Sequence, residues 1–174
     1  MGAFISLHLR RTKKNKSPHD REIPQGMTQK SISYFVAPIN HGRVIKVYDG
    51  DTITVAAYLP YDKSPLYKFS VRISGIDCPE MRTQNPDEKK IAVIARDTLY
   101  KKIFGKIVYL ENVANDKYGR ILADVMYEGK SCGDLLIESR LAVPYDGGTK
   151  ISPDNWVKYY EGTQPHPTYH TFIP

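Results

Sequence analysis

Hydrophobic positions divide the chain near residue 40. Residues 1–38 are mostly polar and basic, contain three prolines, and show neither the period of a strand nor that of a helix. Beyond them, β-branched and other apolar residues recur at regular intervals up to about residue 160. The pattern predicts a flexible basic N-terminal tail over residues 1–38, a folded domain over residues 39–162 and a C-terminal extension over residues 163–174.

The first part of the domain has the pattern of three strands. Residues 42–49 and 51–59 are rich in β-branched residues and meet at an Asp-Gly pair, which is typical of a hairpin turn. Residues 67–76 alternate in part between apolar and polar side chains. Arg72 is therefore expected to point away from the face that its apolar neighbours occupy.

Residues 85–105 carry the clearest helix signal. Asn85 suits the N-cap, Pro86 suits the first helical position, and Glu88 is expected to complete a capping box with Asn85. Apolar residues then recur every three or four positions, which predicts one buried face, and Gly105 ends the helix. The expected buried face consists of Ile91, Ile94, Ala95, Thr98, Leu99 and Ile103.

Two further strands and two helices complete the domain. The strands are expected over residues 106–113 and 120–128, and the helices over residues 133–142 and 152–160, the last one opened by a Ser-Pro pair. Five short strands with a helix between the third and the fourth have the layout of an OB-fold barrel. The sequence thus predicts an α+β fold, a five-stranded OB-fold β-barrel with added helices.

The excess positive charge of the chain is concentrated in the predicted N-terminal tail. The chain has a net charge of +6, but residues 1–30 hold seven of its 25 basic residues and only two of its 19 acidic ones. The folded domain is therefore close to neutral, and its composition does not indicate a broad cationic surface for nucleic acid. Cys78 and Cys132 lack the spacing of a metal site, and we expect them to be reduced in an intracellular protein. No apolar run approaches the roughly 20 residues of a membrane span.

Acidic residues gather at the predicted strand ends. Asp49 and Asp51 flank the glycine of the first turn, and Asp77 and Glu80 follow the third strand. Carboxylates that share a site repel one another, so a cation should compensate them. Oxygen ligands suit Ca²⁺ or Mg²⁺ rather than zinc. Turn residues without a further role are the alternative for the two aspartates of the hairpin.

Arg72 and Arg120 add two guanidinium groups to these carboxylates. Their planar donors match phosphate oxygens in a bidentate way. With a hard cation they would neutralise the charge that develops on a phosphate during a displacement, and a carboxylate free of the metal could activate water. The residues therefore favour phosphodiester hydrolysis, and a non-catalytic OB-fold module that binds nucleic acid or protein is the alternative.

Three stretches carry these residues: "YDGDT", "VRISGIDCPE" and "NDKYGR". Their order and separations resemble the staphylococcal nuclease (thermonuclease) family over about residues 41–145. The resemblance implies an OB-fold barrel with added helices. It also implies a Ca²⁺-dependent endonuclease that acts on DNA and RNA with little sugar specificity and leaves a 3′-phosphate. We expect a monomer.

The resemblance also assigns roles to single positions. Asp51 and Asp77 are the expected calcium ligands, together with the backbone carbonyl of Cys78. Asp49 is expected to support these ligands without binding the metal directly. Glu80 resembles the residue that activates water. The remaining catalytic roles fall on Arg72 and Arg120, which resemble the phosphate-binding arginines, and the substrate-binding roles fall on Tyr118 and Tyr145, which resemble the tyrosines beside the nucleotide phosphate.

The first residues, "MGAFIS", fit the pattern for N-myristoylation of Gly2. One acyl chain binds a membrane only marginally, and a basic patch supplies the second signal. That patch consists of Arg10, Arg11, Lys13, Lys14 and Lys16. The pattern predicts a protein held on the cytoplasmic face of a membrane, as in some plant nucleases of the family. A nuclear-localisation signal or a nucleic-acid-binding arm is the alternative for the same residues.

Overall fold

The computed structural model describes residues 22–167, and the chain divides into two compact units, residues 1–35 and 36–174. Within the described part of the first unit, the chain forms one 3-10 turn, η2 (Gln29–Ser31). Gly2 and the basic patch of the predicted tail lie outside the described residues. Every strand and α-helix of residues 22–167 belongs to the second unit.

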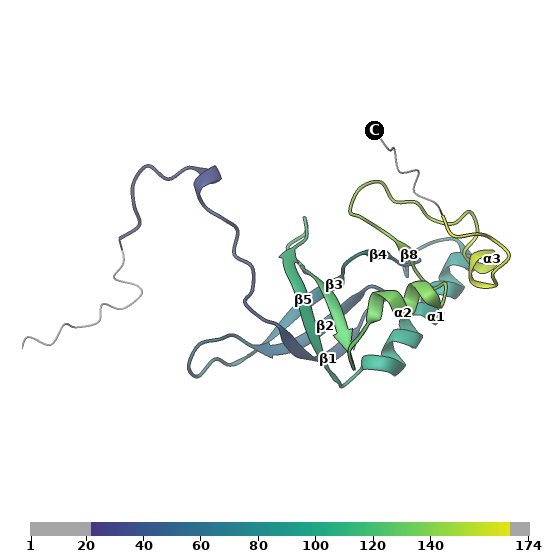
Figure 1. The fold of residues 1–174 in the computed structure, drawn as a ribbon, viewed down its shortest axis with the longest axis horizontal. Coiled ribbons are helices and arrows are strands. Elements are labelled where there is room, and N and C mark those ends of the chain that lie inside the picture. Colours follow the sequence, from purple (N-terminus) through teal and green to yellow (C-terminus); the bar gives the residue numbers. More distant parts are fainter. Residues whose placement is uncertain (1–21, 168–174) are drawn as a thin grey trace, which may run out of the picture. The chain divides into compact units, whose positions relative to one another are not determined.

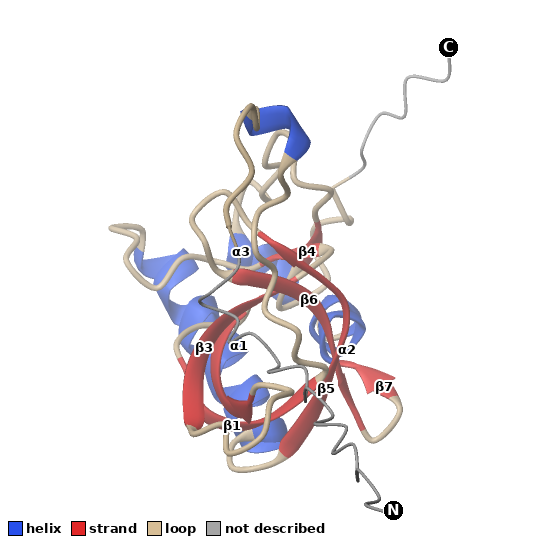
Figure 2. Ribbon diagram, turned by 90° about the vertical axis from the view of Figure 1, so that its left-hand side faces the viewer, coloured by secondary structure: helices blue, strands red, loops and turns tan. Residues whose placement is uncertain are grey.

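Five strands of the second unit form a closed β-barrel. Strands β1 (His41–Val47), β2 (Thr52–Tyr58) and β3 (Leu66–Ile73) form an antiparallel meander, and β5 (Ile107–Asn115) and β6 (Ile121–Tyr127) form a second antiparallel pair. β1 pairs with β5, and β3 pairs with β6 in parallel, which closes the sheet on itself. Figure 2 shows these strands bending around a common centre. The predicted OB-fold barrel is confirmed.

The second unit also has three α-helices: α1 (Pro86–Ile103), α2 (Cys132–Glu138) and α3 (Trp156–Tyr160). α1 contacts β1, α2 contacts β6, and α3 packs against α1. α1 contacts both other helices (Figure 1). The short strand β7 (Lys130–Ser131) extends the sheet at β6, and β4 (Ile76–Asp77) pairs with β8 (Val143–Pro144) in a separate small sheet. The sequence does not predict these three strands, because two residues are too few to show a period.

The start of α1 is held differently from the prediction. Asn85 Oδ1 accepts hydrogen bonds from the backbone N–H groups of Asp87 and Glu88, as expected of an N-cap. The predicted capping box is wrong, because the Asn85 N–H donates to Thr83 Oγ1 instead. The Glu88 carboxylate accepts from the Glu80 N–H at 3.0 Å and from Thr83 Oγ1 at 2.6 Å. The helix thereby fastens the loop that follows β4.

Both later helices are shorter than predicted. α3 begins at Trp156 and not at the Ser-Pro pair, because Asn155 Oδ1 caps it by accepting from the Lys158 N–H at 2.9 Å. α2 ends at Glu138, where the chain turns toward β8 through Arg140 with a left-handed φ of 54°. The turn lets residues 143–144 pair with β4 beside the candidate site.

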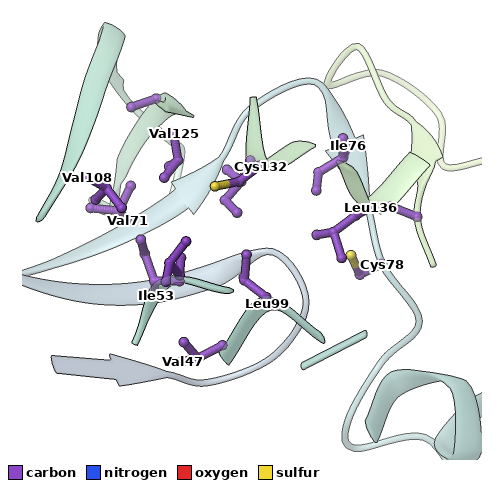
Figure 3. Packing of buried hydrophobic residues seen from close by; sticks show 14 of the residues in the cluster. Val47, Ile53, Val71, Ile76, Cys78, Leu99, Val108, Val125, Cys132 and Leu136 are labelled. Carbon is purple, nitrogen blue, oxygen red and sulfur yellow. The ribbon is translucent and has the colours of Figure 1, made fainter. Parts of the chain in front are cut away.

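The barrel interior and one face of α1 form a single apolar core. Figure 3 shows Leu99 of α1 pointing toward the strands that carry Val47 and Ile53. The buried face of α1 differs from the prediction at three positions, since Ile94 and Thr98 are half-buried whereas Ala92 is fully buried. The thiols of Cys78 and Cys132 are free and buried in the same core.

Candidate active site

Strand pairing brings the predicted site residues to one end of the barrel. Arg72 on β3 lies opposite Thr52 on β2 and opposite Leu122 on β6. Asp51 directly precedes Thr52, and Arg120 comes two residues before Leu122. These two strand pairings therefore place Arg72, Arg120 and Asp51 at the same end of the barrel.

Arg72 bridges two buried carboxylates. Its Nη1 lies 3.2 Å from Asp51 Oδ2, and its Nη2 lies 3.4 Å from Asp77 Oδ1. Nη1 also donates to the backbone carbonyls of Ile73 and Ile76, at 3.0 and 3.1 Å. The guanidinium is thus fixed on several sides and draws together the two side chains predicted to bind a cation.

Asp49 supports the turn that carries Asp51. The Asp51 N–H donates to Asp49 Oδ1 at 3.2 Å. Burial raises the pKa of Asp49 to about 7, and the negative charge of Asp51 adds to the rise. Gly50 allows Cys78 to pack against this turn, because a Cβ at Gly50 would lie 2.7 Å from Cys78 Sγ. The Cys78 side chain therefore shapes the site, which sequence reasoning does not anticipate.

Lys150 enters the site from the segment between β8 and α3. Its Nζ lies 3.0 Å from Asp77 Oδ2 and 3.1 Å from Glu80 Oε1. Asp77 is buried, and its Oδ2 has this ion pair but no hydrogen bond of good geometry. Burial raises the pKa of Asp77, although the positive charges of Lys150 and Arg72 oppose the rise. Sequence reasoning does not find Lys150, which lies 70 residues from Glu80 in a segment without a motif.

Arg120 is oriented by Asp116, four residues before it. Arg120 Nε donates to Asp116 Oδ2 at 2.6 Å, and the N–H groups of Tyr118 and Arg120 both donate to Asp116 Oδ1 at 2.8 Å. Burial alone would raise the pKa of Asp116, but these hydrogen bonds outweigh it and lower the pKa. The sequence prediction omits Asp116, although an aspartate that opens an Asp-x-x-Gly turn is a usable signal.

A cleft of about 710 Å³ lies among these groups. Of the predicted residues, Arg72, Asp77, Glu80, Arg120, Tyr118 and Tyr145 line it, together with Asp116 and Lys150. The Tyr118 side chain is exposed, and its ring centroid lies 5.6 Å from Arg120 Cζ. The Tyr145 ring centroid lies 5.8 Å from Arg72 Cζ. Each arginine thus stands beside one tyrosine, with both pairs facing the same cleft.

The oxygen donors at this site fit a hard divalent cation. Among residues 22–167, no three His, Cys, Asp or Glu side chains form a metal-binding group on their own. The carboxylates of Asp51 and Asp77 both form an ion pair with the Arg72 guanidinium. The buried Oδ2 of Asp77 lacks a hydrogen bond. Within residues 22–167, the carboxylates of Asp51, Asp77 and Glu80 form ion pairs with two cations, Arg72 and Lys150. The surplus negative charge favours a bound cation.

Fold and site together define a class of protein. The fold is a closed five-stranded OB-fold barrel, and one cleft contains acidic residues, two arginines and two tyrosines. This combination is suited to binding a phosphate ester. The family model described as staphylococcal nuclease homologue matches residues 70–160. This chain belongs to the staphylococcal nuclease family.

Several curated proteins resemble the chain. A probable endonuclease of Schizosaccharomyces pombe is 34% identical over 173 residues, which cover 87% of this chain and 74% of that protein. The staphylococcal-like nuclease CAN1 of Arabidopsis thaliana is 33% identical over 88 residues, 49% of this chain and 25% of that protein. An uncharacterized endonuclease of Escherichia coli is 29% identical over 107 residues, 61% of each chain. The chain thus spans most of the yeast relative but a quarter of the plant protein.

Proposed function

We propose that this protein is a Ca²⁺-dependent endonuclease that hydrolyses the phosphodiester bonds of DNA and RNA with little sugar specificity and leaves 3′-phosphates. The observation that carries the proposal is the convergence of Arg72, Asp51 and Asp77 in one buried cluster beside Glu80 and Arg120. Membership of the nuclease family and the relatives named as endonucleases support it.

The cation would be held by Asp51, Asp77 and the backbone carbonyl of Cys78. When bound, Ca²⁺ supplies positive charge to the phosphate oxygens and makes the phosphorus easier to attack. The chain itself supplies rigid ligands. Thr52 Oγ1 donates to Asp51 Oδ1 at 2.9 Å, and Arg72 fixes the second oxygen of Asp51 and one oxygen of Asp77. Fixed ligands lower the cost of reorganisation when the cation binds.

The two arginines are suited to bind the phosphate that reacts. Arg72 is anchored on two backbone carbonyls, and Arg120 is anchored on Asp116, so each presents a positioned fork to the cleft. Guanidinium groups fixed in this way stabilise the negative charge that grows on the phosphate oxygens in the transition state. Tyr118 and Tyr145 flank these arginines and would bind the substrate beside the nucleotide phosphate.

Glu80 is the carboxylate suited to activate water. It is the exposed acid of the cluster, at the edge of the cleft, and its backbone N–H is held by Glu88. Proton transfer from a water molecule to Glu80 would generate the nucleophile, and departure of the 5′ oxygen would leave a 3′-phosphate. Because water attacks and the 2′-hydroxyl is not needed, the same site can act on both DNA and RNA.

Digestion of plasmid DNA and of RNA, with added Ca²⁺ or with a chelator, tests this proposal. We expect cleavage of both substrates with Ca²⁺ and none with the chelator. Glu80→Gln and Arg120→Lys should each lower the rate by about 100-fold or more. Glu138→Gln, a matched charge change on the exposed side of α2, should not. Wild-type rates in both site variants would refute the roles given to Glu80 and Arg120. No calcium-dependent cleavage by the wild type would instead favour a non-catalytic binding module.

We also propose that a myristoyl group on Gly2 and the adjacent basic patch attach the enzyme to the cytoplasmic face of a membrane. The proposal rests on the sequence alone and takes Met1 as the initiator. Among residues 22–167, no helix combines the length and apolarity needed to cross a bilayer. The intact mass of protein made in a eukaryotic host decides the matter. A free or acetylated Gly2 without the myristoyl mass would contradict lipid attachment and leave a nuclear or nucleic-acid-binding role for the patch.

A further inference from the structure

Lys150 is a cation of the described site that is carried by a loop. It lies in the segment between β8 and α3, and its Nζ bridges Asp77 Oδ2 and Glu80 Oε1 at 3.0 and 3.1 Å. These are the two carboxylates on either side of the Cys-Pro pair after β4. A single ammonium group therefore joins the proposed metal ligand to the proposed general base.

This ammonium occupies the free side of Asp77. Oδ1 of Asp77 faces Arg72, so Oδ2 is the oxygen left for another cation, and Lys150 is the partner that it has. Two positive ions that share one carboxylate oxygen repel each other at short range. A divalent ion that binds through Oδ2 must therefore displace Lys150 or share the oxygen at a cost in affinity.

The two cations of the cluster differ in how firmly they are held. The Arg72 side chain is 13% exposed and donates to two backbone carbonyls in addition to its ion pairs. The Lys150 side chain is 39% exposed, and the groups that it pairs with in the site are the two carboxylates. Lysine also has a flexible stem and a compact charge, so it can leave an ion pair without breaking a fixed array of hydrogen bonds. Arg72 is therefore expected to keep its ion pairs when a metal ion binds, whereas Lys150 can give up its ion pair with Asp77.

The segment that carries Lys150 is anchored at its start and contains two successive glycines. The Tyr145 N–H donates to the Gly75 carbonyl at 2.9 Å, which fixes the start of the segment beside β4. Gly147 follows with a left-handed φ of 92°, and the Gly148 N–H donates to Asp146 Oδ1 at 2.8 Å. Two successive glycines allow the backbone beyond this turn to move at low steric cost.

We propose that Lys150 is a built-in counter-cation that pairs with Asp77 and Glu80 in the metal-free protein and competes with the divalent ion for Asp77. The inference rests on the proposed calcium site. In the metal-free protein, Lys150 keeps two neighbouring carboxylates from repelling each other. When the metal binds, the ammonium gives up Asp77 and stays in the cleft, where it adds to the positive charge offered to the phosphate. Lys150 is thus a positioning residue that sets the calcium affinity.

Calorimetric titration of the full chain with Ca²⁺, in the absence of nucleic acid, tests the competition. Lys150→Met removes the charge and keeps the length of the side chain, and it should bind Ca²⁺ about tenfold more tightly than the wild type. Lys117→Met is the matched control, because Lys117 lines the same cleft but its Nζ lies over the Tyr118 ring at 5.2 Å. It should change the affinity by about twofold or less.

Thermal unfolding adds a readout that does not require the metal. In chelator, Lys150→Met should melt below the wild type, since Asp77 and Glu80 lose their counter-charge, and saturating Ca²⁺ should remove the difference. Unchanged or weaker calcium affinity in Lys150→Met would overturn the inference while calcium-dependent cleavage keeps the proposed function. If neither protein binds Ca²⁺, both the competition and the proposed calcium site are wrong. Tight binding by Lys150→Met alone would support the inference in its strongest form.

Discussion

Replacing Arg72 with methionine should destabilise the fold strongly, and the structure gives the size of the effect. The change leaves Asp51 and Asp77 buried, at 8% and 5% exposure, without the guanidinium that pairs with both. Two backbone carbonyls, of Ile73 and Ile76, lose a donor as well. Removing one partner of a buried ion pair costs about 3–5 kcal/mol. For a unit of this size the melting temperature should fall by roughly 10 °C.

Denaturant unfolding followed by fluorescence measures this loss. Trp156, the single tryptophan of the chain, is buried and reports on the packing of α3. Arg96→Met is the matched control, because Arg96 forms an ion pair with Asp97 in which the two side chains are 33% and 48% exposed. That exposed pair should be worth about 1 kcal/mol or less. Equal losses in the two variants would refute the view that Arg72 holds buried charge together. Added Ca²⁺ should restore part of the loss in Arg72→Met alone.

Two further predictions concern residues that position the catalytic groups. Asp116→Asn should cost about 1 kcal/mol of unfolding free energy at neutral pH, because the amide keeps the turn but loses the ion pair with Arg120. The pKa of Asp116 is lowered on folding, so its stabilisation is present above its ordinary value of 3.8 and is lost as the pH falls through the lowered pKa. Denaturant titrations at several pH values should therefore show the two proteins converging in acid, and a constant difference would contradict this cause. Glu88→Gln should lower the cleavage rate about tenfold with little change in melting temperature. The reason is that the side chain loses one of the two oxygens that accept from the Glu80 N–H and Thr83 Oγ1. A fall in stability that matches the fall in rate would point to unfolding instead.

Local patterns predict the regular elements well and their ends poorly. The periodicity of residues 85–105 predicts α1 correctly, because a helix of 18 residues contains enough turns to show one face. The role of Glu88 is predicted wrongly, because its partners Glu80 and Thr83 lie in a loop whose path depends on the whole fold. The Ser-Pro pair before α3 likewise looks like a helix start, but the nearer Asn155 supplies the cap.

Site residues that lie in recognisable sequence motifs can be predicted from the sequence. Site residues that only the tertiary fold brings to the cleft cannot. Asp51, Arg72 and Asp77 stand within short stretches that sequence reasoning singles out, and the structure brings them together. Lys150 has no such context, because a lysine in a Gly-rich segment is most often solvated. Its contact with Glu80, 70 residues away, follows from the pairing of β4 with β8. Contacts of this kind require the topology, which no local pattern contains.

The strand pair that closes the barrel links the core to the chemistry of the site. Side chains alternate along β3, with Val71 and Ile73 in the core and Arg72 on the other face. A shift of one residue in the pairing with β6 would turn Arg72 into the core and an apolar side chain into the cleft. The apolar core thus selects the register that delivers the guanidinium to Asp51 and Asp77. Because these carboxylates are buried and need that guanidinium, the charges of the site disfavour the shifted register as well. Core packing and site electrostatics therefore select the same closure, and we infer that the site contributes to the specificity of the fold.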